Sequence, residues 1–79
     1  MSADPAEIAR ALTPAQKRAL LWLPADGAHR NISRGGPHSD VLWRVRRNGL
    51  AIYVGVGVFR ASPLGLAVRE LLEKEHTDG

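Results

Sequence analysis

The chain has 79 residues, the size of one domain, and it contains no cysteine. A domain this short buries only about 60% of the surface that its unfolded chain exposes, so we expect modest stability without disulfides or thiolate metal sites. The net charge of +3 is unevenly spread, because residues 17–60 carry eight basic and two acidic side chains while both ends are acidic. A basic middle indicates an anionic partner or, equally, a solvated surface that keeps a small protein soluble.

No apolar run approaches the roughly 20 residues that a membrane span requires. The first residues are acidic, and they lack the basic region followed by an apolar region that makes a signal peptide. We therefore expect a cytoplasmic protein that does not enter a membrane.

Two helix-start patterns open the chain. In the first, residues 4–7 (Asp-Pro-Ala-Glu) combine a capping side chain, a proline in the first turn and a glutamate that can reach back to the cap. Residues 13–16 (Thr-Pro-Ala-Gln) repeat the pattern and predict a second helix over residues 14–23, which Pro24 ends.

The second helix carries Lys17 and Arg18 in its first turn. This is the unfavourable end for basic side chains, because the helix dipole places positive charge there. The conflict indicates either ordinary surface charge, which is the commoner case, or a pair kept for a partner.

Residues 24–38 are predicted to be a long basic loop, because they contain two prolines, three glycines and no helical period. Connections of this length are unusual in a small domain and are often functional. Arg30 and Arg34 supply basic charge, and Ile32 is the only large apolar side chain, which we expect to hold the loop against the core.

Two histidines of this segment, His29 and His38, lie near Asp26 and Asp40 in the sequence. A metal site needs three or four converging ligands, usually with shorter characteristic spacings. We therefore expect no metal site here, and solvent-exposed histidines instead.

Residues 39–47 predict a short basic helix. Ser39 is a good N-cap residue, and Gly49 stands after Asn48 where a left-handed residue ends a helix. At about 100° per residue, one face is apolar and the opposite face is basic. The apolar face carries Val41, Leu42 and Val45, and the basic face carries Trp43, Arg44 and Arg47, with Arg46 at the border.

Trp43 is the most informative residue of this helix, because it lies among arginines and away from the apolar face. An exposed tryptophan beside arginines is typical of a stacking or hot-spot residue. The alternative, with equal weight, is that the first helix packs on that side and buries the indole.

A hairpin and a last helix follow. Alternation over residues 50–54 predicts a strand, Gly55-Val56-Gly57 supplies the turn, and residues 58–60 return. Ser62-Pro63 starts a helix to about residue 75, with flexible ends expected at 1–3 and 76–79. The predicted core of this single domain consists of Leu20, Leu23, Val45, Leu50, Ile52, Phe59, Val68 and Leu71.

Two stretches resemble a winged helix-turn-helix domain. Residues 12–23, with Leu-Thr-Pro-Ala-Gln at their start, are similar to the opening helix of many bacterial winged-helix regulators. Residues 39–50 and 59–65 are similar to the recognition helix, the wing and the start of the following helix. The helix that normally precedes the recognition helix is replaced by a glycine-rich loop, and the wing has no basic tip. In that family the recognition helix enters the major groove, so the resemblance implies groove-facing positions at Ser39, Trp43, Arg44 and Arg47.

Catalytic patterns are absent from the sequence. The glycines of residues 55–57 are not followed by the third glycine, lysine or serine of a nucleotide-binding loop. No serine, histidine and carboxylate occur in a pattern typical of a triad, and the chain is small for an enclosed pocket. We expect no enzyme and no cofactor.

We therefore predict an α+β fold, a winged-helix-like domain with three to four helices and one two-stranded β-hairpin. The leading hypothesis is a module that binds or competes with nucleic acid. The alternative is a phage-type inhibitor of a host protein complex, for example an anti-CRISPR that blocks DNA binding by a CRISPR surveillance complex, with its arginines on an acidic protein surface. Anti-CRISPR proteins are similar here in size, charge and simplicity. The predicted binding residues are Arg30, Arg34, Ser39, Trp43, Arg44, Arg46 and Arg47.

Overall fold

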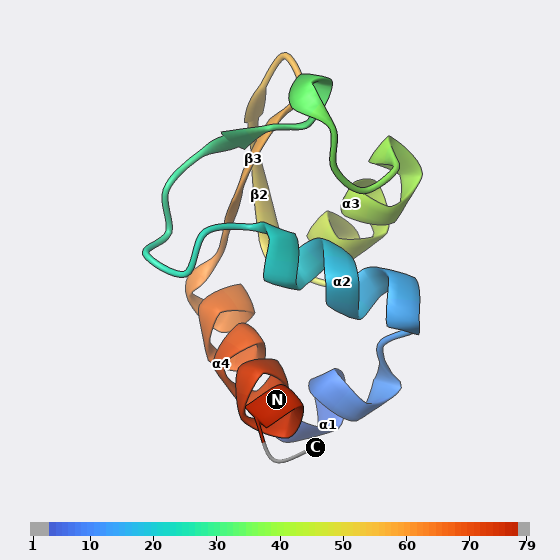
Figure 1. Cartoon of the computed structure of the whole chain (residues 1–79), viewed down its shortest axis with the longest axis vertical. Helices are drawn as coiled ribbons and strands as arrows, with labels where there is room; N and C mark the ends of the chain where they lie inside the picture. The colour runs from blue at the N-terminus through green and yellow to red at the C-terminus, as the bar shows by residue number, and fades with distance from the viewer. Residues whose placement is uncertain (1–3, 78–79) are drawn as a thin grey trace.

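The computed structural model describes residues 4–77, which form a small α+β domain with four α-helices and a three-stranded antiparallel sheet (Figure 1). The predicted α+β class and the predicted number of helices are therefore confirmed. In chain order the elements are α1 (Pro5–Ala11), α2 (Pro14–Trp22), β1 (Arg30–Asn31), the 3-10 turn η1 (Ile32–Arg34), α3 (Ser39–Arg47), β2 (Ala51–Gly55), β3 (Val58–Ala61) and α4 (Pro63–Thr77). No helix in this part of the chain is long and apolar enough to cross a membrane.

The last helix is longer than predicted, because α4 continues to Thr77. Residues 76–77, where we expected a flexible end, are the last residues of this helix. The same expectation for residues 1–3 and 78–79 lies outside the described residues.

The predicted β2–β3 hairpin forms. The prediction that it would be the whole sheet is wrong, because β1 adds a third strand from inside the predicted loop. The strand order is β1-β3-β2, with Arg30 opposite Phe59 and Asn31 opposite Val58. Two residues are too few to show the alternation by which a strand is recognised in a sequence. Ile32 follows β1, donates its N–H to the Gly57 carbonyl at 3.0 Å and packs against the core, as predicted.

The caps of α1 and α2 form as predicted. The Asp4 carboxylate accepts the Ala6 N–H at 3.0 Å. Thr13 and Gln16 form a complete capping box, in which each side chain accepts the other residue's backbone N–H at 3.1 Å. α2 ends at Trp22, one residue before the predicted end, because the residue that precedes a proline is pushed out of the helical region.

Two arginines from later in the chain hold the carbonyls at the end of α2. Arg69 of α4 donates from Nε to the Leu23 carbonyl at 2.9 Å and from Nη2 to the Leu21 carbonyl at 3.0 Å. Arg30 of β1 donates from Nη1 to the Trp22 carbonyl at 2.7 Å. Carbonyls at the end of a helix lack intrahelical partners, and positive charge is favourable there. These bonds attach α2 to both β1 and α4.

α3 turns into β2 through a Schellman motif. Gly49 adopts a φ of +79° and donates its N–H to the Arg46 carbonyl at 2.9 Å. Leu50 donates its N–H to the Val45 carbonyl at 3.1 Å, and both of these side chains are fully buried. This pair of bonds, with an apolar contact between the two residues, defines the motif. The predicted glycine stop is confirmed.

Ser62 joins this corner to α4. Its hydroxyl donates to the Gly49 carbonyl at 2.6 Å and accepts the Gly65 N–H at 2.9 Å, which caps α4 where the sequence predicted its start. Gly65 lies directly on the corner, because a Cβ atom there would be 1.9 Å from the Leu50 carbonyl oxygen. Only glycine permits so close an approach.

The core lies between the helices and one face of the sheet. Six of its predicted residues are buried: Leu20, Leu23, Val45, Leu50, Phe59 and Val68. The predictions for Ile52 and Leu71 are wrong, since both are only half-buried. Ile52 lies next to Tyr53, whose strand partner Phe59 is buried, so the strand period turns Ile52 to the outer face of the sheet. On α4 the residue that joins Val68 in the core is Leu72, at 3% exposure.

Candidate functional site

α3 exposes its arginines and its tryptophan while its apolar side packs on the rest of the domain. We call Trp43, Arg44, Arg46 and Arg47 the basic helix patch, and all four residues are exposed. Leu42 and Val45 are fully buried, and α3 packs against α2 and β2. The predicted division of this helix into an apolar and a basic face is confirmed.

The indole of Trp43 is 42% exposed and is supported from below by two aromatic rings of the sheet. Its ring centroid lies 4.8 Å from that of Tyr53 and 5.5 Å from that of Phe59. The guanidinium carbon of Arg46 lies 5.4 Å from the centre of the Trp43 ring. The alternative that the first helix buries Trp43 is wrong, because the aromatic contacts of Trp43 come from β2 and β3. The indole is thereby held in one orientation with part of its surface open.

A hollow of about 290 Å³ lies on this side of α3, lined by Asp40, Trp43, Arg44 and Arg47. The indole gives it an aromatic wall, and two guanidinium groups give it anion-binding donors. The Asp40 carboxylate repels an anion at the start of the helix and so favours anions near the arginines. The hollow suits a planar ring against Trp43 with a phosphate on Arg44 or Arg47.

The N-cap of α3 is His38, so the prediction of Ser39 is wrong. The Nδ1 atom of His38 accepts the Asp40 N–H at 3.2 Å. Ser39 is the first helical residue and is half-buried. A neutral imidazole nitrogen accepts a hydrogen bond as a serine hydroxyl does, and the sequence places both acceptors side by side. Local preference alone does not decide between them.

The loop arginines have different surroundings. The guanidinium group of Arg30 is turned to α2, where it donates to the Trp22 carbonyl and lies 4.7 Å from the centre of the Trp22 ring. Arg30 is therefore engaged within the fold and is not brought to the basic helix patch. Arg34 belongs to η1, and its side chain lies outside the described part of the structure.

Tyr53 and Phe59 position Trp43 but were not among the predicted site residues. They are directly opposite each other on β2 and β3, with ring centroids 5.2 Å apart, and therefore lie on one face of the sheet. The signal available in the sequence was the strand period, which turns Tyr53 to the face of β2 opposite to that of Ile52. The register across the turn is what brings the two rings together.

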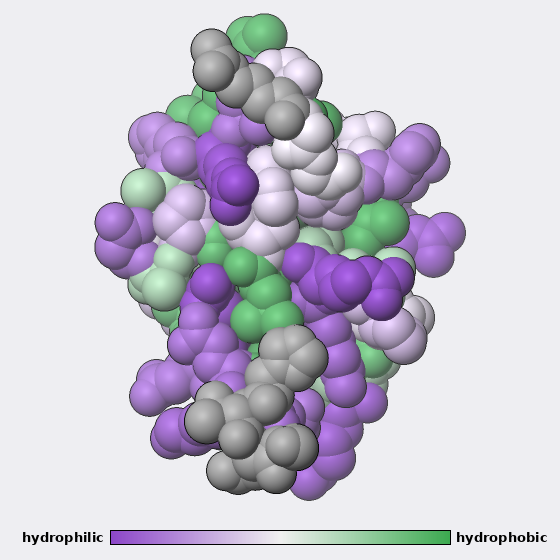
Figure 2. Space-filling view, in the orientation of Figure 1, coloured by the Kyte–Doolittle hydropathy of each residue, from purple (hydrophilic) through white to green (hydrophobic). Residues whose placement is uncertain are grey.

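The remaining chemistry of the surface is simple. Figure 2 shows hydrophilic residues over most of the viewed face, with a hydrophobic strip across its middle and hydrophobic atoms at the hairpin tip. Among the described side chains, no group of three or more histidines, cysteines or carboxylates is placed to hold a metal ion. Comparisons found no protein-family model, no curated protein and no solved structure that matches this chain.

Proposed function

We propose that this protein is a winged-helix-like module that binds nucleic acid through the basic helix patch. The observation that carries this proposal is the indole of Trp43, fixed on Tyr53 and Phe59 among three exposed arginines of one helix. Arginines attract phosphates regardless of sequence, and an exposed aromatic ring stacks on bases. Because the indole is already held by these rings, its binding does not carry the cost of ordering that side chain.

The arrangement of the elements supports docking by α3. The β2–β3 hairpin lies beside this helix (Figure 1). In chain order η1 comes between α2 and α3, where the winged-helix family has a full helix. In this pose α3 lies in the major groove, with Arg44 and Arg47 on the phosphates beside Trp43. Val56 at the tip of the hairpin then approaches the DNA with an apolar side chain in place of a basic one.

The test is the salt dependence of binding to a labelled random-sequence duplex, followed by fluorescence anisotropy. Each phosphate contact adds about −0.9 to the slope of log K against log salt. Contacts from Arg44 and Arg47, with Arg46 of the same patch as the third, predict a slope of about −2.7. The double variant Arg44→Gln, Arg47→Gln should weaken binding to every sequence and bring the slope to about −0.9.

A matched control removes the same two positive charges elsewhere. Arg10→Gln with Lys74→Gln changes exposed residues of α1 and α4, and it should keep the slope of the unchanged protein. Equal losses in the two double variants would assign binding to net charge, and the basic helix patch would have no special role. Absence of binding at low salt would refute the proposal outright.

The hairpin tip favours a second candidate function, the phage-type inhibitor of a host protein complex, for example an anti-CRISPR that blocks a CRISPR surveillance complex. Val54 is 47% exposed and Val56 is 90% exposed, and neither side chain offers anything to a phosphate. Exposed apolar groups of this kind are typical of protein contacts. The arginines would then meet acidic protein surface. The purified domain would bind duplex poorly at low salt yet prevent the target complex from binding its DNA, and Val56→Asp would abolish that inhibition.

A further inference from the structure

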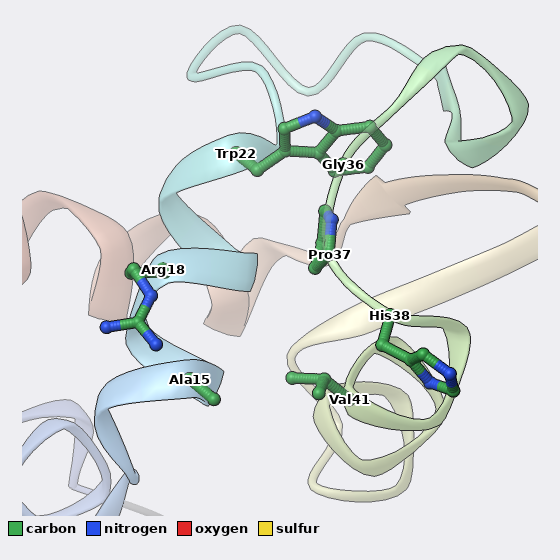
Figure 3. A pocket seen from close by; sticks show the side chains of 7 residues that line it. All are labelled: Ala15, Arg18, Trp22, Gly36, Pro37, His38 and Val41. Atoms are coloured by element: carbon green, nitrogen blue, oxygen red, sulfur yellow. The ribbon is translucent and has the colours of Figure 1, made fainter.

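Two open hollows lie side by side on α2 and share no residue with the basic helix patch. The first, of about 460 Å³, lies between α2 and the segment that leads into α3, and its apolar lining includes Ala15, Trp22, Pro37 and Val41 (Figure 3). The second, of about 370 Å³, lies between α2 and α4, and its apolar lining consists of Pro14, Leu21 and Leu72. Both volumes fall in the usual range for binding pockets.

Arg18 is the residue that both hollows share. At about 100° per residue, Ala15 and Trp22 lie on one side of α2, Pro14 and Leu21 lie on the adjacent side, and Arg18 falls between them. Its side chain is exposed, and no hydrogen bond or ion pair holds its guanidinium group within the described part of the chain. The charged side chain of Arg18 therefore lies on the ridge of α2 between the two hollows, without a partner in the described part of the chain.

The first hollow has a preformed wall. The Trp22 ring is held by the guanidinium group of Arg30, whose central carbon lies 4.7 Å from the ring centre. The backbone of Gly36 lies so close to the indole that a Cβ atom at this position would be 2.7 Å from the ring. The indole cannot move into the hollow without losing these contacts. This wall of the hollow is thus in place before any partner arrives.

The charges of the two hollows select an anion. Arg18 and His38 are the basic residues that line the first hollow, and no carboxylate lines it. In the second, Lys17 and Arg18 outnumber Glu75. Lys17 also lies in the first turn of α2, where the helix dipole disfavours positive charge. An acidic partner beside Lys17 would offset that unfavourable placement.

Both hollows are open to solvent, since Arg18, His38 and Gly36 are exposed at the rim of the first. A free small molecule would leave much of its surface in water, whereas typical pockets bury about 70–90% of their ligand. A nucleic acid would place charged phosphates against apolar walls. We propose that the two hollows bind a peptide segment of a partner protein in which acidic residues lie between two large apolar side chains.

The test uses two tetrapeptides that differ only in charge, acetyl-Phe-Asp-Glu-Leu-amide and acetyl-Phe-Asn-Gln-Leu-amide. Each is titrated into the ¹⁵N-labelled full chain and followed by NMR. The acidic peptide should give saturable shifts at Arg18, Gly36 and the Trp22 indole N–H. The amide peptide should bind about tenfold more weakly, because a hydrogen bond to a carboxylate is stronger than one to a neutral amide.

Variants separate this site from the basic helix patch. Arg18→Gln should make the two peptides bind equally, and Arg10→Gln, on α1, should preserve their difference. Equal binding of the two peptides by the unchanged protein, or no saturable shift in the hollows, would overturn the proposal. Displacement of the acidic peptide from these residues by duplex DNA would assign the hollows to nucleic acid and would also overturn it. The Arg44→Gln, Arg47→Gln variant should bind the peptide normally, so each proposal fails or survives independently of the other.

Discussion

Arg69 offers the sharpest test of how this domain is held together. Its side chain is 13% exposed, donates to the carbonyls of Leu21 and Leu23, and pairs with Glu73 on its own helix. Arg69→Met keeps most of the hydrocarbon stem and removes both cross-helix bonds. Hydrogen bonds to charged groups contribute about 1.5–3 kcal/mol each. Because the freed carbonyls at the helix end can bond to water, we expect the free energy of unfolding to fall by about 2–4 kcal/mol.

Thermal and urea unfolding, followed by circular dichroism, measure this loss. In a domain of this size 1 kcal/mol corresponds to roughly 4–8 °C, so the melting temperature should fall by roughly 10–25 °C. Arg69→Lys should recover less than half of the loss, because an ammonium group lacks the planar fork that reaches both carbonyls. Lys74→Met is the matched control on the same helix, where a 4.0 Å pair with Glu70 is mostly exposed and contributes about 0.5 kcal/mol or less. Equal effects of Arg69→Met and Lys74→Met would refute the reasoning.

Four further substitutions test three other parts of the fold by the same unfolding measurements. Gly65→Ala should destabilise the domain by about 1–3 kcal/mol or more, because its Cβ would overlap the Leu50 carbonyl, and a neutral result would mean that α4 does not contact this corner. Val56→Asn should leave stability unchanged or raise it by up to about 1 kcal/mol, since Val56 has a φ of +46° and asparagine tolerates this region better, whereas a loss would indicate that the valine makes an unseen contact. Leu72→Ala should cost about 2–5 kcal/mol and Leu71→Ala clearly less, and the reverse order would place the wrong face of α4 in the core.

The parts of the fold that could be predicted from the sequence are those whose partners are close in the chain. The capping box of α2 needs only Thr13 and Gln16, and the glycine stop of α3 needs only residues 45–50. β1 could not be predicted in this way, because two residues show no period and form a strand only where β3 is already present. Its partner lies more than 25 positions later in the chain, opposite Arg30 and Asn31.

The features of the candidate site also differ in whether they depend on residues close in the chain or on distant ones. Helical period alone places Arg44 and Arg47 opposite Val45, and the structure agrees. The half-exposed state of Trp43 depends on where Tyr53 lies, which is fixed by strand register and not by the helix. The hydrogen bond from Arg30 to the Trp22 carbonyl could not be predicted from local sequence patterns either. The composition of a loop does not indicate which carbonyl a guanidinium group will bind.

The bonds from Arg69 to the carbonyls at the end of α2, which we call the arginine clasp, have a consequence for synthesis on the ribosome. The carbonyls of α2 lie 46 and 48 positions before Arg69, the residue that binds them. A nascent chain therefore exposes α2 without these bonds, and without the apolar cover of Val68 and Leu72, until nearly all of α4 has emerged. We expect ribosome-bound chains arrested before α4 to be cleaved rapidly by a protease and complete chains to resist it. Protection of the shorter chains would show that the first three helices fold without the clasp.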